Sequence, residues 1–526
     1  MQRKLILVIA VLTHLCFVAR GQTPSYTRAN PAANPDSALQ TILQTLDGTP
    51  LLLHDAVESA LSNATSVRSA EAVYMAAGGS RRKEAGYFDP RLFFTFNHLD
   101  IQAPTASFFA GASVLASKQD SLNGGLFWNL PTGTSIALAL NTVRLETNSS
   151  FASLNPQYTT FGVLSLRQPL LGGFFVSASK NLTKADHDLD AAKARYDQEV
   201  LATSTQVEQT YWDLYAAERD YAVQKLTRDR AEAFLKETEM RAKTGLIGPN
   251  QVANARTFLA EQEILLLDSE ERLERLSDQL SSLIGKKPGE GKSRLLAVDH
   301  PPDDFAIAEL DVLVEQARQS NLSIQAAKAD VESRRAFARA GFWEALPQVD
   351  LVGSIGGSGL NGVPQNVVFG GVTYTASRSG TLGDAIESTV KREFPAWSVG
   401  VNVSVPIGFR SGLGEQDRLE AEVAIAEQRR IQVERMLDEQ VHASYRDLFN
   451  GKRRLKAARE GVEAAQEQVR IGVIEFQNGR STAFELVRLG ADFAAAQQRY
   501  TQALVRSAKA AASLRQLTSG AYSSTR

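Results

Sequence analysis

The sequence predicts an α+β membrane protein in which long coiled-coil helices are joined to a transmembrane antiparallel β-barrel. Three observations predict this fold class. The chain of 526 residues carries an internal two-fold repeat, two very long stretches have the spacing of coiled-coil helices, and segments between the helices alternate apolar with small polar residues.

The N-terminus has the features of a secretory signal peptide. A short basic region precedes an apolar stretch, and Ala19-Arg20-Gly21 then supplies small residues three positions apart, as signal peptidase requires. The apolar stretch is too short for a membrane-spanning helix, which needs about 20 residues. We predict a cleaved signal over 1–21 and an N-terminal periplasmic linker over 22–50. Lipidation at Cys16 is the alternative, but small residues do not precede this cysteine.

The composition excludes several classes of protein. Cys16 is the single cysteine and the six histidines are scattered, so neither a disulfide framework nor a Cys/His zinc cluster is available. A formal net charge of −2 gives no bias toward nucleic acid. Because no motif of a hydrolase or metalloprotease occurs, we predict no enzyme, no catalytic residue, no metal and no cofactor.

Segments of the first half recur in the second half. Tyr211-Trp212-Asp213-Leu214 recurs as Tyr445-Arg446-Asp447-Leu448, and Thr244-Gly245-Leu246 recurs at the same spacing as Asn478-Gly479-Arg480. Such self-similarity indicates a duplicated structural unit. The predicted division is a first repeat over 51–285, an inter-repeat linker over 286–307, a second repeat over 308–520 and a C-terminal tail over 521–526.

Both repeats have the same order of helices. A helix rich in Ala, Leu, Glu and Arg comes first, a very long helix follows the strands, and a further helix follows a glycine turn. The predicted helices are 51–88, 177–244 and 250–284 in the first repeat, and 308–345, 413–478 and 483–518 in the second. The two shorter helices of a repeat together match the length of the long one, so stacked end to end they could lie antiparallel beside it.

The second long helix carries an unbroken seven-residue apolar spacing. Its positions are Val441, Leu448, Leu455, Val462, Val469 and Phe476. The equivalent positions of the first long helix are Val207, Leu214, Tyr221, Arg228, Leu235 and Ala242. Sustained heptads indicate helices that supercoil around neighbours. A soluble coiled-coil rod has the same periodicity, so this pattern alone leaves both readings open.

The segments before each long helix alternate like membrane strands. In 397–405, Trp397 and four valines face one way, whereas Ser398, Gly400 and Asn402 face the other. Lipid outside and water inside require this pattern, although a soluble sandwich also shows it. The predicted strands are 91–99, 122–130, 134–145 and 158–168 in the first repeat (about 91–168), and 348–356 and 396–406 in the second (about 348–406). Six strands are fewer than the roughly eight of the smallest membrane barrels, so the barrel must be shared between chains.

The duplicated order of helix, strands, long helix, turn and helix resembles the TolC-type outer membrane efflux protein family. The resemblance also rests on two strand-to-helix junctions, Gln168-Pro169-Leu170-Leu171-Gly172-Gly173 and Val405-Pro406-Ile407-Gly408, and on the turns at Gly245 and Gly479. It implies a homotrimer with a shared twelve-strand barrel in the outer membrane lipid of a Gram-negative bacterium, above a long periplasmic α-helical tunnel. It further implies a periplasmic adaptor (membrane fusion) protein and an inner-membrane pump as partners.

Two features depart from the family pattern. The family contributes four strands per chain, whereas the first repeat offers an additional hairpin around Pro131, which either enlarges the barrel or lies outside it. Family members with a closed periplasmic entrance can carry two acidic residues after the second tip glycine, where this chain has Glu485 and Arg488. Opposite charges three residues apart on a helix could instead pair with each other or across subunits.

The resemblance assigns three groups of candidate residues. The adaptor-contact residues at the periplasmic tips are Thr244, Gly245, Leu246, Asn478, Gly479, Arg480 and Ser481. The candidate periplasmic entrance comprises Phe476, Glu485 and Arg488, and the strand-to-helix junctions comprise Pro169, Gly172, Gly173, Pro406 and Gly408. For the tip glycines, a plain need for positive φ at a helix end is the alternative.

These expectations combine into a passive exit duct for export across the periplasm and the outer membrane, serving a tripartite efflux pump or a type I secretion system. The alternative is a periplasmic coiled-coil scaffold or surface adhesin without a transport role.

Overall fold

The structure, a computed structural model, describes residues 37–245, 247–305, 307–478 and 480–520. The predicted signal peptide, the first part of the predicted linker 22–50 and the predicted C-terminal tail lie outside these residues. The chain divides into two compact units, which we call the helical unit and the sheet unit. The helical unit takes its residues from 1–74, 192–327 and 430–526, and the sheet unit comprises 75–191 and 328–429.

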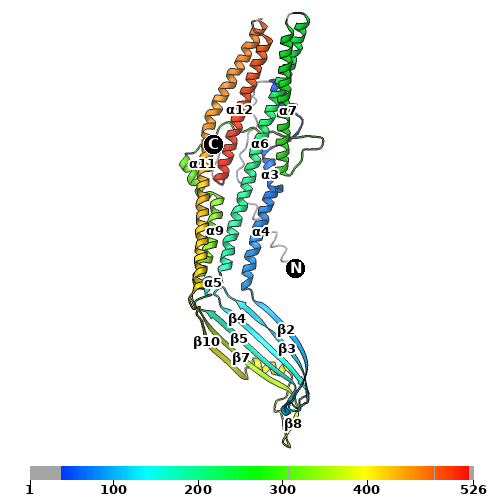
Figure 1. Ribbon diagram of the computed structural model, residues 1–526, viewed down its shortest axis with the longest axis vertical. Helices are drawn as coiled ribbons and strands as arrows, with labels where there is room; N and C mark the ends of the chain where they lie inside the picture. Colours follow the sequence, from blue (N-terminus) through cyan, green and yellow to red (C-terminus); the bar gives the residue numbers. More distant parts are fainter. Residues whose placement is uncertain (1–36, 246, 306, 479, 521–526) are drawn as a thin grey trace. The chain divides into compact units, whose positions relative to one another are not determined.

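The helical unit is built from helices and one small parallel sheet (Figure 1). Its helices are α2 (Ser37–Gln44), α3 (Leu53–Asn63), α7 (Pro249–Ile284), α8 (Leu310–Ser320), α12 (Ala483–Leu517) and most of α6 (Lys180–Lys243) and α11 (Arg410–Gln477). Strands β1 (Thr49–Leu51) and β6 (Leu295–Ala297) pair in parallel. Helices α4 (Thr65–Ala85) and α9 (Leu322–Ala345) begin in this unit and continue into the other.

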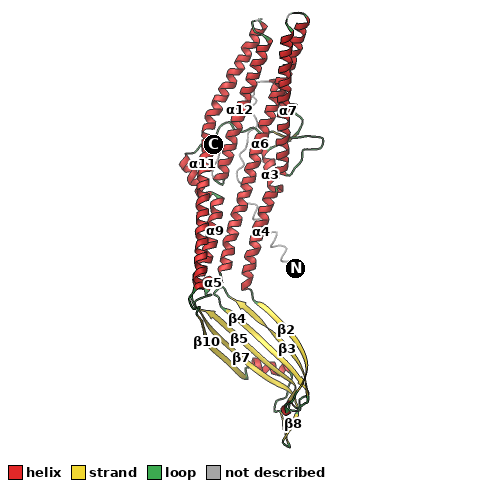
Figure 2. Cartoon of the chain, viewed as in Figure 1, coloured by secondary structure: helices red, strands yellow, loops and turns green. Residues whose placement is uncertain are grey.

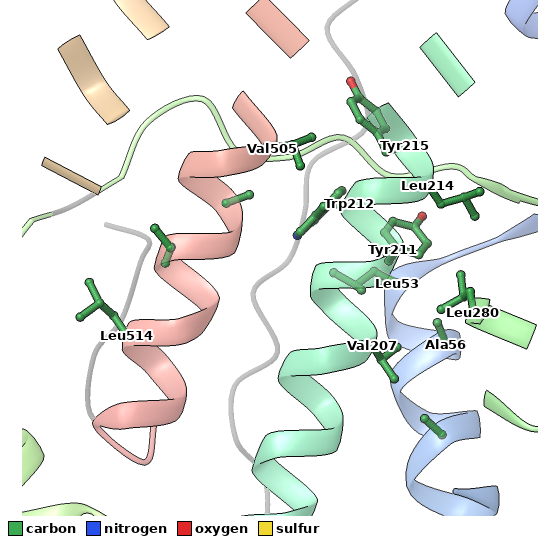
Figure 3. Packing of buried hydrophobic residues seen from close by; sticks show 14 of the residues in the cluster. Leu53, Ala56, Val207, Tyr211, Trp212, Leu214, Tyr215, Leu280, Val505 and Leu514 are labelled. Atoms are coloured by element: carbon green, nitrogen blue, oxygen red, sulfur yellow. The ribbon is translucent and has the colours of Figure 1, made fainter. Parts of the chain in front are cut away.

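The core of the helical unit is centred on the first recurring motif. Tyr211, Trp212 and Leu214 of α6 are fully buried, and side chains from α3, α7 and α12 surround this part of α6 (Figure 3). Because three bulky residues of one helix are buried together, several neighbours must pack around it rather than one. In the second repeat the heptad positions Val441, Leu448 and Leu455 are likewise buried.

The prediction of one continuous helix over 51–88 and one over 308–345 is wrong, because both are broken near their starts. α3 ends before Ala64, whose extended backbone (ψ 127°) interrupts the helix. α8 ends before Asn321, whose side-chain oxygen accepts from the backbone N–H groups of Ser323 and Ile324 and so caps α9. Residue preference alone does not reveal such a break, since a side-chain cap competes with the helix only where packing allows it.

At each break, an asparagine side chain forms a hydrogen bond with the end of another helix. The Asn321 side-chain amide donates to the backbone oxygen of Leu517, at the end of α12, at 2.9 Å. Asn63, at the end of α3, donates in the same way to Ile284, the last residue of α7, at 3.4 Å. The shorter helices of each repeat therefore meet end to side at an asparagine, and the carbonyls at the helix ends find partners there.

The inter-repeat linker is fixed to α6 by buried polar groups. The N–H of Ala297 donates to the Glu218 carboxylate at 2.6 Å, and Tyr215 Oη lies 2.7 Å from His300 Nδ1. Burial raises the pKa of Glu218 to about 7, although the Ala297 N–H and Arg219 oppose the shift. Burial, with Arg219 beside the ring, lowers the pKa of His300 to about 4. Both groups are therefore mostly neutral between these two pKa values, since His300 gains its charge below about 4 and Glu218 gains its charge above about 7.

The sheet unit is organised around one antiparallel sheet of six strands in the order β10-β7-β5-β4-β3-β2 (Figure 2). Its strands are β2 (Arg91–Pro104), β3 (Val114–Asn129), β4 (Ser135–Thr147), β5 (Leu154–Pro169), β7 (Gln348–Pro364) and β10 (Phe394–Ser404). All six predicted strands belong to this sheet, and several are longer than predicted. The hairpin around Pro131 joins β3 to β4, with Leu130 N–H donating to Thr134 O at 2.8 Å, so this hairpin lies inside the sheet.

The two faces of this sheet differ in chemistry. One row of paired residues crosses all six strands on one face: Trp397, Ile355, Leu164, Leu138, Leu126 and Leu92. We call this the apolar face. The opposite face, which we call the polar face, presents Asn97, Asn123, Ser165, Ser354 and Ser398. Trp397 is 75% exposed and Leu92 is 84% exposed, so the apolar face is open within one chain.

The segment between β7 and β10 contains regular structure, although no helix or strand is predicted for it from the sequence. It contains a hairpin of β8 (Asn366–Phe369) and β9 (Val372–Thr375), followed by α10 (Leu382–Val390). A capping box starts α10, since Thr381 and Asp384 satisfy each other's backbone N–H groups. None of the described helices has the length and apolar character needed to cross a bilayer.

Candidate functional site

The first tip connects α6 to α7 by a short turn. Gly245 has a φ of +74° and its N–H donates to Ala242 O at 3.0 Å, while Thr244 Oγ1 donates to Arg241 O at 2.9 Å. A residue with a Cβ is strained at this φ, so glycine is needed to end α6 here. Thr244 and Gly245 are both exposed, and nothing lies within 4 Å of the position of a Cβ on Gly245. Leu246, the third tip residue of this turn, lies outside the described residues.

The second tip connects α11 to α12. Asn478 caps the end of α11, its side-chain amide donating to Ile474 O at 2.8 Å, and the N–H of Arg480 donates to Glu475 O at 2.8 Å. Thr482 begins α12 by accepting from the N–H of Glu485 at 3.2 Å. Gly479 lies outside the described residues, so the structure leaves its predicted role untested.

The two tip hairpins pack against each other within the helical unit. Phe234 of α6 and Phe484 of α12 have ring centroids 6.1 Å apart, and the Arg230 side chain lies 3.1 Å from the position of a Cβ on Gly490. Further along, Lys509 of α12 pairs with Asp213 of α6 at 2.6 Å. The structure thus brings the first and second groups of tip residues to one end of one unit.

The predicted entrance residues lie just beyond the second tip. Glu485 is exposed on the first turn of α12, where its carboxylate accepts from Ser481 Oγ at 3.2 Å. Arg488 is exposed less than one turn further along the same helix. The side chain of Phe476 lies outside the described residues. A carboxylate in the first turn of a helix is stabilised by the helix dipole, which gives Glu485 a structural role besides any role at an entrance.

The predicted junction residues lie where the strands meet the long helices. Gly173 (φ +90°) and Pro169 contact the turn at Gly133, and Gly172 N–H donates to Pro347 O at 3.3 Å. Gly408 (φ +91°) similarly joins β10 to α11. The first junction borders a cavity of about 350 Å³, which Glu84, Arg167 and Gln348 also line. These glycines and prolines lie where the chain passes from a strand to a long helix.

Sequence reasoning missed the site where α10 covers the apolar face. Gly357 and Gly359 of β7 lie on that face, and Cβ atoms on them would collide with the backbone oxygens of Thr389 and Ala385 in α10. Thr160 Oγ1 of β5 donates to Ala385 O at 2.7 Å. The helix therefore sits directly on the strand backbone, and side chains at these two positions would exclude it. The glycine pairs of 353–362 were the available signal.

Beside α10, the apolar face changes to charged residues. A single row of paired residues holds His98, Asp120, Arg144 and Tyr158 on four consecutive strands. His98 Nδ1 lies 2.6 Å from Asp120, and Arg144 donates to the same carboxylate at 3.1 Å. This row lies on the same face as Leu92 and Phe94, further along the strands from the helices. The apolar side chains of this face, which we call the apolar band, therefore end at the row that begins with His98.

Comparison with known proteins decides the family. The family model described as "Outer membrane efflux protein" matches residues 135–286 and 313–520, which is more than half of the chain. The chain belongs to the outer membrane efflux protein family. The resemblance inferred from the duplicated junctions and turns is thereby confirmed. A comparison with curated protein sequences gives no match.

Several solved structures of outer-membrane proteins share the fold of this chain. The outer-membrane channel OprN is 16% identical, with 95% of this chain and 97% of that chain covered at a TM-score of 0.62. VceC of Vibrio cholerae is 14% identical (89% and 95% covered, TM-score 0.59). CmeC of Campylobacter jejuni is 13% identical (89% and 86% covered, TM-score 0.61). At these identities the likeness shows the fold.

Membership of the outer membrane efflux protein family gives the broad function and place of the chain. It is an efflux channel component in the outer membrane of a Gram-negative bacterium, and it is not an enzyme. The prediction of a passive protein that is not an enzyme is thereby confirmed by the family. A scaffold or adhesin without a transport role is correspondingly disfavoured.

Proposed function

We propose that the chain is the exit duct of a tripartite efflux pump or type I secretion system, and that it works as a homotrimer. Three copies share one transmembrane β-barrel and one α-helical periplasmic tunnel. Each chain is a duplicated unit, with repeats over 51–285 and 308–520. The observation that carries this proposal is the six-stranded sheet with one apolar and one polar face, which cannot close by itself.

The helices give independent support for association. Ile264, Leu265 and Leu267 of α7 are 60%, 45% and 64% exposed, and Phe449 of α11 is 48% exposed. Monomeric proteins rarely leave such a run of large apolar side chains open to water. Neighbouring copies would cover them. With 64 residues, α6 alone has a contour length of about 96 Å, on the scale needed to cross a periplasm.

The partners follow from the tips. Thr244, Gly245, Leu246 and the second group, Asn478 to Ser481, would contact a periplasmic adaptor protein, and an inner-membrane pump would supply the energy. The exposed turn at Gly245, with open space around its Cα, supports a docking role because a partner can approach the backbone closely there. Glu485 and Arg488, with Phe476, would border the periplasmic entrance.

Reconstitution tests the proposal. Purified full-length protein should run as a heat-sensitive trimer on gels and should conduct ions across planar lipid bilayers, because a shared barrel encloses water. Protein that stays monomeric in detergent and leaves the bilayers electrically silent would contradict the proposal.

A further inference from the structure

The six-stranded sheet ends in two unpaired edges. β2 and β10 lie at opposite ends of the strand order, and among the described residues each of them pairs on one side only (Figure 1). In a bilayer the unpaired backbone groups of an edge strand have no water to bind, so both edges need a partner strand. Closing the sheet within one chain would give six strands, fewer than the smallest membrane barrels have. The partner must be a second copy.

We propose that β2 of each copy pairs antiparallel with β10 of the next copy in one defined register, so that three copies close a barrel of eighteen strands. The trimer is taken from the function proposed above. The direction of pairing follows from the sheet: all five steps from β10 to β2 are antiparallel, so the two edge strands run in opposite directions. A copy of β10 placed beside β2 is therefore antiparallel to it.

The two faces limit the register. On β2 the apolar face carries even-numbered residues such as Phe94, and on β10 it carries odd-numbered residues such as Val401. A slip of one residue would turn every apolar side chain of one strand to the water-filled side. Even-numbered residues of β2 must therefore stand opposite odd-numbered residues of β10.

The strand lengths limit it further. β10 spans 11 residues and β2 spans 14, so β10 can be paired along its whole length in only a few positions. Two of these positions also place the apolar side chains of both strands on the same face of the sheet. In the first, Arg91 stands opposite Ser404 and Ile101 opposite Phe394. In the second, Phe93 stands opposite Ser404 and Ala103 opposite Phe394.

Both registers agree with barrel geometry. Within one copy, a row of paired residues runs across the sheet from Pro395 on β10 to Phe94 on β2. In the next copy the row continues on β10 at Val401 in the first register, or at Val403 in the second. One copy therefore shifts the row along β10 from Pro395 to Val401 or to Val403. The tilt follows from the ratio of this shift along the strand to the width of the six strands. With a rise of about 3.3 Å per residue and a spacing of about 4.8 Å per strand, the two registers give strand tilts of about 35° and 43°. Outer-membrane barrels have tilts of about 35–45°.

Charge selects the first register. There the valines of β10 face the apolar residues of β2 (Leu92–Val403, Phe94–Val401 and Phe96–Val399), and Asp100 lies opposite Pro395, beyond the valines. The second register would place Asp100 opposite Trp397, within the apolar band. Because a charged side chain on the lipid side is disfavoured more strongly the deeper it lies, the first register is preferred.

The strand count changes the width of the duct. Three six-stranded sheets make eighteen strands, where the family resemblance implied twelve. Barrel diameter grows roughly linearly with strand number, so this barrel would be about 1.5-fold wider. The β3–β4 hairpin, which the sequence left as a departure from the family, supplies the additional pair of strands in each copy.

Disulfide trapping tests the seam. Asn97→Cys and Ser398→Cys are combined in a full-length chain that carries Cys16→Ser, so these two thiols are the only ones present. In the first register these positions face each other on the polar side, at about 4.5–5.5 Å between Cα atoms, within disulfide reach. After mild oxidation, non-reducing gels should show a covalent ladder that ends at three times the mass of one chain.

Two matched pairs serve as controls. Asn97→Cys with Gly400→Cys reports the second register, and Asn97→Cys with Val399→Cys places the thiols on opposite faces. Both should cross-link at least fivefold less. Stronger trapping with Gly400→Cys, or trapping within single chains only, would overturn the proposed seam. A ladder that ends at two or four copies would overturn the trimer and the count of eighteen while leaving the β2–β10 pairing intact.

Discussion

The side-chain amide of Asn321 donates a 2.9 Å hydrogen bond to the backbone oxygen of Leu517, although 196 residues separate them. The same asparagine caps α9 through its side-chain oxygen. Asn321 therefore caps the start of α9 and also binds the end of α12. Asn63 makes the equivalent bond to Ile284 at 3.4 Å, so the two repeats use the same residue type at the same junction.

Replacing Asn321 by Leu should lower the free energy of unfolding by about 1–3 kcal/mol, because a cap is lost and a buried carbonyl is left without its donor. Thermal unfolding of the purified protein, followed by the helical circular dichroism signal, measures this. Asn63→Leu is the matched comparison and should cost less, since its bond is longer. Equal or reversed effects would show that these amides do not hold the helix ends.

Glu218 should make stability depend on pH in a stated direction. Its pKa in the folded protein is about 7, above the usual 4.5, so the folded state holds the proton more tightly and loses stability as pH rises from about 4.5 through 7. Glu218→Gln removes this loss. The stability of the variant relative to the natural protein should therefore increase over this range, by up to about 3 kcal/mol, and stay constant above pH 8.

Urea unfolding at pH 5 and pH 8 measures the difference. Glu460→Gln serves as the control, because the Glu460 side chain is 65% exposed. A Glu218→Gln effect that is the same at both pH values would contradict a carboxyl that is protonated by burial.

The close approach of α10 to β7 predicts a selective effect of side-chain size. Gly359→Val should displace α10, because the new side chain would occupy the place of the Ala385 backbone oxygen. Gly353→Val lies on the same strand and face, but its Cβ would meet its nearest neighbour at 3.8 Å, an ordinary contact. Trypsin should cleave at Lys391 several-fold faster in the first variant and at an unchanged rate in the second. Equal cleavage rates would argue against tight packing of this helix.

The tip turn predicts a loss of export without a loss of assembly. Gly245→Glu, alone or with Gly479→Glu, places bulky negative charge where the adaptor would approach, and the positive φ at Gly245 adds local strain. Export in cells should fall to background while trimers still form. Gly461→Glu introduces the same charge in open space within α11 and should leave export unchanged. Normal export by the tip variants would remove the tips from the adaptor interface.

Much of the architecture could be predicted because it depends on periodic patterns. The ends of α6, α7, α11 and α12 agree with the predicted ends within a few residues, since glycine turns and heptads mark them clearly. The strands were found because Trp397 and the following valines alternate without interruption. The break at Asn321 is not marked by periodicity, and the second bond of its side chain goes to a helix end nearly two hundred residues away.

The apolar face of the sheet is the part of the fold that sequence patterns predict least. α10 is short, and its place depends on the absence of side chains at Gly357 and Gly359 on another segment, which periodicity does not register. The row of His98, Asp120 and Arg144 becomes visible only once the strand register is known. Pairwise register across strands is a long-range property, whereas sequence patterns report one strand at a time.

The position of α10 also limits where lipid can be. In the proposed barrel, acyl chains could not occupy the part of the sheet that this helix covers, and they would avoid the ionic row beside it, so both features would set one edge of the bilayer around the protein. The opposite edge would follow from the strand ends near Leu92 and Val403. On this proposal, Gly357, Gly359 and the ion pair between Arg144 and Asp120 together fix the depth of the chain in the outer membrane.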